Sequence, residues 1–114
     1  MQIVTTPLRI QDLQNLADQN FGNLVKAVVD VEKSILVIND ELHADLEHFL
    51  LEHGSQQKHL WGINLHPALF NTKDFIEYDS MINLRPNQGN MTRGVDDPLI
   101  RSQIQKIIAP LFYQ

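Results

Sequence analysis

The stretch FIEYDSMINLRPNQGNMTRG, Phe75–Gly94, combines an alternating segment with a polar loop. Residues of its first half alternate between apolar and polar, which is typical of a β-strand with one buried face. The predicted strand directs Ile76, Tyr78, Ser80, Ile82 and Leu84 to one face and Glu77, Asp79, Asn83 and Arg85 to the other. The second half is a loop that ends in Arg93 and Gly94. The stretch therefore predicts a sheet strand whose polar face and following loop bring carboxylates, amides and guanidinium groups together.

Four further strands are predicted on the N-terminal side of this stretch. Segments rich in apolar and β-branched residues place them at Gln2–Thr5, Leu24–Val31, Ser34–Ile38 and Leu60–Leu65. The second and third of these strands would form a hairpin around Glu32 and Lys33, although neither residue is favoured in turns.

Three helices are predicted from apolar residues that recur three and four positions apart. The first begins at Pro7, the second spans Asp40–His53, and the third begins at Pro98 and ends or bends at Pro110. The order of these elements predicts an α+β fold in a single domain over residues 1–114. We expect a mainly antiparallel sheet of four to five strands, with the three helices packed chiefly on one face.

The composition limits the kinds of partner. The chain has a formal charge of −5 and a pI near 5.4, whereas proteins that hold nucleic acid mainly through phosphate contacts are usually basic. This argues against a nucleic-acid partner, but Ser80–Val95 carries Arg85 and Arg93 and no acid, which leaves a local basic site open. The chain has no cysteine and no apolar run near the ~20 residues that a membrane span requires. Because the N-terminus also lacks the features of a signal peptide, we expect a cytoplasmic protein without membrane contact.

The polar face of the predicted strand is the first candidate site. If the two most C-terminal strands pair, their polar faces would bring together Asn64, His66, Glu77, Asp79, Asn83 and Arg85. Glu77 beside a cation could act as a general base, and His66 or His43 as a general acid. Arg85 could hold a carboxylate or phosphate through two parallel hydrogen bonds. The alternative is a half-solvated strand with no ligand, on which polar residues also alternate.

The loop RPNQGNMTRG, Arg85–Gly94, has the composition of an anion-binding loop. Gly89 and Gly94 allow backbone N–H groups to approach a ligand closely, while Arg93 supplies charge and Asn90 a neutral donor. The loop contains no phosphate-loop or dinucleotide signature. The alternative is a surface loop whose asparagines and glycines form turns.

The second predicted helix carries three histidines, His43, His48 and His53, which are five residues apart and so cannot share one face. His43 and Glu47 share a face, as do His48 and Glu52, and either pair could supply two metal ligands, but a third would have to come from elsewhere. The alternative is a solvated helix edge with His–Glu pairs. We predict no metal site and no cofactor. His43 lies at the boundary between the apolar and polar faces of the helix, where its ring could reach a cleft.

Several blocks of the chain resemble a known family. They are FGNLVKAVVDVEK at Phe21–Lys33, ELHADLEHFLLEHGS at Glu41–Ser55, LWGINLHP at Leu60–Pro67 and DSMINLRPNQGNMTRGVDDPLIR at Asp79–Arg101. The family consists of uncharacterised small prokaryotic proteins that share a domain of unknown function and are common in cyanobacteria and other bacteria. The resemblance implies a bacterial cytosolic protein, and it lends no mechanism and no catalytic residues.

The chain is also similar, in residue kinds and layout alone, to the small metal-independent ribonucleases of the barnase and toxin type. That resemblance implies Glu77 as the base, a histidine as the acid, and Arg85 and Arg93 on the scissile phosphate.

Three hypotheses follow. The first is a protein that binds a small anionic ligand or a protein partner through Arg85, Arg93, Asn83, Asn90, Asn64 and Asp79. The second is a metal-independent ribonuclease-like phosphodiesterase with Glu77, His43 or His66 as its catalytic groups. The third is a structural or regulatory homodimeric subunit, with Leu99 and Phe112 supplying apolar surface beside the last helix. The sequence leaves open whether the protein is an enzyme.

Overall fold

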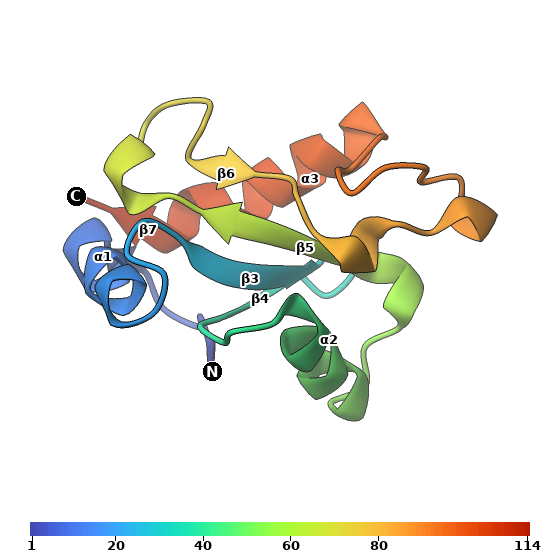
Figure 1. Ribbon diagram of the computed structural model, residues 1–114, viewed down its shortest axis with the longest axis horizontal. Helices are drawn as coiled ribbons and strands as arrows, with labels where there is room; N and C mark the ends of the chain where they lie inside the picture. Colours follow the sequence, from blue (N-terminus) through green and yellow to red (C-terminus); the bar gives the residue numbers. More distant parts are fainter.

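A five-stranded antiparallel sheet forms the centre of the computed structural model, which describes residues 1–114 (Figure 1). The strands occur in the order β1-β4-β3-β5-β6. Their bounds are Gln2–Ile3 for β1, Val25–Asp30 for β3, Ile35–Ile38 for β4, Leu60–Leu65 for β5 and Ile76–Glu77 for β6. The three helices are α1, Ile10–Gln19, α2, His43–Glu52, and α3, Pro98–Ile108. The predicted α+β class and mainly antiparallel sheet are confirmed.

Both faces of the sheet are covered by helices. Leu13 of α1 and Ile104 of α3 belong to the larger apolar cluster, which includes one alternating set of strand residues such as Val29. Leu46 of α2 packs with the opposite set, which includes Val28, in a smaller cluster. Two of the three helices thus share one face, and Figure 1 shows α2 across the sheet from α3. Because β3, β4 and β5 are buried on both faces, they are almost continuously apolar. None of the three helices combines the length and the apolar character that a membrane crossing needs.

A second, two-stranded sheet ties the ends of the chain together. Strand β2, Leu8–Arg9, pairs in parallel with β7, Phe112–Tyr113. The prediction that the first helix begins at Pro7 is therefore wrong, because the residues after the proline remain extended until Ile10. The predicted end of α3 near Pro110 is confirmed, since the helix gives way to a single 3-10 turn at Ala109–Leu111.

The hairpin between β3 and β4 is present, and a buried carboxylate stabilises its turn. Oδ1 of Asp30 accepts hydrogen bonds from the backbone N–H groups of Glu32 and Lys33, both at 3.0 Å. Its Oδ2 accepts the hydroxyl of Ser55 at 2.7 Å. Asp30 thus supplies the turn chemistry that Glu32 and Lys33 lack.

The predicted strand from Phe75 to Arg85 is wrong beyond its first residues. Strand β6 ends at Glu77, and two 3-10 turns follow at Met81–Asn83 and Pro86–Gln88. Ser80 crosses β5 so closely that a Cβ on Gly62 would lie 2.6 Å from the Ser80 Cβ. A Cβ on Gly62 would point out of the plane of the sheet, so Ser80 lies over the face of β5 and the chain has left the sheet at this crossing.

Candidate functional site

A cleft of about 400 Å³ opens where the start of α2 meets the ends of β3, β5 and β6. We call it the polar cleft and define it by its six polar side chains that carry charge, an amide or an imidazole: Lys26, His43, Asn64, Glu77, Asp79 and Arg93. The rest of its wall is formed by Ser80 and by apolar side chains, among them Leu42 and Met81. Its volume is within the range of about 300–1,000 Å³ that is usual for small-molecule sites.

Asn64 lies on β5 opposite Glu77 of β6 and is only 6% exposed. Its Nδ2 donates to the Glu77 carboxylate at 2.9 Å and to the backbone carbonyl of Asp79 at 3.3 Å. Its Oδ1 is buried and has no hydrogen-bond partner. A buried acceptor without a partner costs about 1–3 kcal/mol, so this atom marks a place where a donor would bind favourably.

Glu77 receives two donors on the same oxygen. Oε1 accepts from Asn64 and lies 3.2 Å from Nε2 of His66. These hydrogen bonds, with that from Asn64 the larger influence, lower the pKa of the Glu77 carboxyl below its ordinary value. Glu77 is therefore ionised at neutral pH, and His66 stands behind it, outside the lining of the cleft.

His43 is the first residue of α2 and is largely buried beside Asn64. Its Nε2 lies 2.8 Å from the carbonyl oxygen of Ile63, and because a carbonyl only accepts, this nitrogen carries a hydrogen. Burial is the main reason that the pKa of His43 is below its ordinary value. The ring is thus neutral at pH 7, and its Nδ1 is an acceptor.

Arg93 and Lys26 are the cations of the polar cleft. Arg93 uses its Nε to bind Asp79 at 2.7 Å, and its side chain is 55% exposed. Its backbone carbonyl accepts from Ser80 and from Asn83, which fixes the base of the side chain. Lys26 lies opposite Asn64 on β3, with its Nζ 4.9 Å from the centroid of the Phe21 ring and without a carboxylate partner. Lys26 was not among the predicted site residues, because only the register of β3 against β5 places it there.

Arg85 lies outside the polar cleft, which corrects its predicted place on the same face as Glu77. It is 8% exposed, and its terminal nitrogens donate to the carbonyl of Gln57 and, at 2.6 Å, to that of Leu60. Its guanidinium lies 4.2 Å from the centroid of the Trp61 ring. Arg85 thus joins two backbone segments. The phosphodiesterase hypothesis needs Arg85 and Arg93 on one phosphate, and the structure does not bring them together.

Asn83 and Asn90 also lie outside the cleft and determine the shape of the loop. Asn83 binds both backbone polar groups of Gly62. Nδ2 of Asn90 donates to the carbonyls of Asn83 and Gly94, both at 2.8 Å, and its Oδ1 accepts the N–H of Asp96. These amides are used within the chain, which leaves them no free donor for a ligand.

The predicted anion-binding loop holds a carboxylate of its own chain. Asp96 accepts the N–H of Met91 at 2.7 Å and the hydroxyl of Thr92. The hydroxyl of Thr92 is the first cause, and the N–H of Met91 the second, of a lowered pKa of Asp96. Asp96 thus occupies the donors of this loop that were expected to bind a ligand.

The other predicted features are separate from the cleft. No three His, Cys, Asp or Glu side chains are grouped so that they could hold a metal ion. Burial raises the pKa of Glu47, which responds to the charge of Arg85 rather than to His43. Leu99 is 73% exposed, whereas Phe112 is 5% exposed and belongs to the larger apolar cluster, so Phe112 supplies no surface to a dimer.

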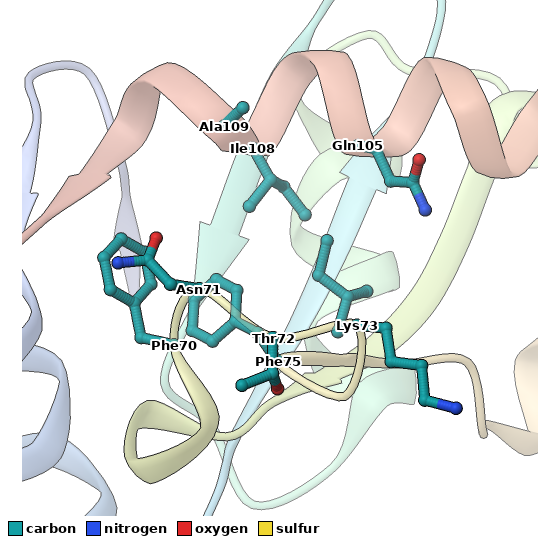
Figure 2. Close-up of a pocket in the computed structure, with 9 residues that line it drawn as sticks. Phe70, Asn71, Thr72, Lys73, Phe75, Gln105, Ile108 and Ala109 are labelled. Carbon is teal, nitrogen blue, oxygen red and sulfur yellow. The ribbon is translucent and has the colours of Figure 1, made fainter.

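A smaller hollow of about 270 Å³ lies between α3 and the segment 70–76 (Figure 2). Figure 2 shows Phe75 on the loop side facing Ile108 on the helix. Its wall is mainly apolar and contains no buried polar atom that lacks a partner. The polar cleft is therefore the stronger candidate site.

Comparison with known proteins agrees with the resemblance seen in the sequence. A family model described as "Protein of unknown function (DUF5674)" matches residues 2–111. No curated protein and no solved structure matches the chain. The geometry of the polar cleft is therefore the basis for any functional conclusion.

Proposed function

The chain belongs to the DUF5674 family of proteins of unknown function, and we propose that it binds a small anionic molecule in the polar cleft. The observation that carries this proposal is that Lys26 and Arg93 line one cleft on a chain whose formal charge is −5. Cations that line a concave site attract an anion more strongly than exposed cations on the open surface.

The cleft also holds Glu77 and Asp79, which balance the formal charges of Lys26 and Arg93, so the attraction for an anion depends on which donors remain free. Glu77 is bound by Asn64 and His66, and Asp79 by Nε of Arg93. The two terminal nitrogens of Arg93 and the Nζ of Lys26 have no hydrogen-bond partner within the chain. A planar guanidinium with free terminal nitrogens suits the oxygens of a carboxylate or phosphate.

Thermal unfolding in the presence of inorganic phosphate tests the proposal. A ligand at ten times its Kd stabilises the folded state by about 1.4 kcal/mol, which raises Tm measurably. We expect the wild-type shift to be lost in Arg93→Ala. We expect it to be kept in Arg101→Ala, which removes the same charge from the exposed surface of α3. An equal loss in both variants would mean a general charge effect and would refute the cleft as the site.

A further inference from the structure

The inner wall of the polar cleft offers hydrogen-bond acceptors. Oδ1 of Asn64 is buried without a partner, and Oε2 of Glu77 has no hydrogen bond. The nearby N–H donors already make hydrogen bonds within the chain. The side-chain amide of Asn64 donates to Glu77 and to the Asp79 carbonyl, and Nε2 of His43 donates to the carbonyl of Ile63. A ligand with only acceptor oxygens would leave this wall unsatisfied.

The opposite kind of group is available at Lys26 and Arg93, whose free nitrogens are donors with positive charge. The cleft therefore presents both acceptors and positively charged donors to a ligand. Its lining also includes Leu42 and Met81, whose side chains are exposed and apolar. A ligand that satisfies all three parts has an N–H-bearing group, an anionic group and a short carbon skeleton.

We infer that the ligand of the polar cleft is a small zwitterion of the amino acid class. Its amino group lies against Asn64 Oδ1 and the Glu77 carboxylate, and its carboxylate lies against Arg93 and Lys26. This inference rests on the proposed function, because it assigns the same cations to the anionic end. The inference goes beyond the proposed function in requiring that the ligand also carries an amino group.

An NMR titration of the ¹⁵N-labelled full chain tests the inference. The standard amino acids are added singly at millimolar concentration, followed by inorganic phosphate. The tightest-binding amino acid is then compared with the acid that lacks its amino group and with the amine that lacks its carboxylate. We expect the Asn64 side-chain amide signals to shift with the amino acid, and both truncated compounds to bind at least tenfold more weakly.

The outcomes separate the inference from the proposed function. If the deaminated acid binds as tightly as the amino acid, or only phosphate shifts signals of the cleft, the zwitterion is refuted and anion binding stands. If no compound shifts these signals, both are refuted.

A matched pair of variants adds a second readout. Glu77→Gln removes a negative charge from the cleft, and we expect it to weaken binding of the amino acid at least tenfold without weakening binding of the deaminated acid. Glu52→Gln removes the same charge from an exposed position on α2 that pairs with His48, and we expect no effect on either compound. Equal effects of the two variants would overturn the assignment of the amino group to Glu77.

Discussion

The side-chain amide of Asn83 binds the backbone of Gly62 as a neighbouring strand would. Its Oδ1 accepts the Gly62 N–H at 2.8 Å, and its Nδ2 donates to the Gly62 carbonyl at 2.9 Å. The edge of β5 is thus satisfied beyond the end of β6 without a further strand. Because one side chain does this, the backbone at Asp79–Ile82 is free to turn and line the polar cleft.

Replacing Asn83 should therefore destabilise the fold. Asn83→Ala leaves the N–H and C=O of Gly62 buried and unpaired, and we expect a loss of about 2–4 kcal/mol in the free energy of unfolding. Urea unfolding followed by circular dichroism measures it. The control is Asn87→Ala in the same loop, an exposed residue without side-chain hydrogen bonds, which should change stability by less than about 0.5 kcal/mol. Similar losses in both variants would contradict the role given to Asn83.

The crossing of Ser80 over Gly62 makes a second prediction. In Gly62→Ala the new Cβ would meet Cβ and Oγ of Ser80, both at 2.6 Å, and we expect a cost of about 3 kcal/mol from overpacking. Adding Ser80→Gly removes both atoms and should recover part of the loss. Thermal unfolding of the two single variants and the double variant gives the coupling. Purely additive losses would show that the two residues do not meet.

The two arginines of the loop should respond differently to removal. Arg85→Met leaves the carbonyls of Gln57 and Leu60 without their donor, and we expect about 2 kcal/mol of destabilisation or more. Arg93→Ala removes an exposed ion pair with Asp79 and should change stability by less than about 1 kcal/mol. The midpoints of urea unfolding measure the two losses of stability. A larger loss in Arg93→Ala than in Arg85→Met would contradict the structural role given to Arg85.

His43 should make stability depend on pH just below neutrality. Its folded-state pKa is lowered by burial, whereas in the unfolded chain it is near 6.5. Below pH 6.5 the unfolded chain therefore binds a proton that the folded chain does not, and stability is lost as pH falls toward the folded pKa. The slope from this one group is at most about 1.4 kcal/mol per pH unit.

His43→Gln keeps an N–H donor and cannot titrate, so it should reduce the loss of stability between pH 7.5 and 5.5. Urea unfolding at the two pH values measures the difference from wild type, and an NMR titration of the His43 ring gives its pKa directly. A ring pKa above 6.5, or equal losses in the two proteins, would contradict the assigned neutral form.

The sequence was a good guide where a local pattern determines the structure. The spacing of apolar residues correctly predicted α2 and α3. The start of α3 was predicted from Asp97 and Pro98, and the Asp97 side chain accepts the N–H of Leu99 there. Five of the six residues that define the polar cleft were also predicted as site candidates, with Lys26 the exception.

The errors arose where distant residues override a local pattern. The alternation of apolar and polar residues through Arg85 predicts a strand, but the Asn83 side chain binds the edge of β5 where that strand would pair. Arg85 lies apart from Glu77 because its guanidinium donates to the carbonyls of Gln57 and Leu60. Leu8 and Arg9 are extended because Phe112 and Tyr113 pair with them from the other end of the chain. No pattern within either segment reveals these partners.

A phosphate titration of the ¹⁵N-labelled protein, followed by two-dimensional NMR, tests most directly whether the polar cleft is the binding site. We expect progressive, saturable shifts of the Asn64 side-chain amide and of the backbone signals of Lys26, Asp79 and Arg93, with the signals of Phe75 and Ile108 unchanged. Signals of the cleft that stay fixed while phosphate shifts others, or that stay fixed altogether, would contradict anion binding in the polar cleft.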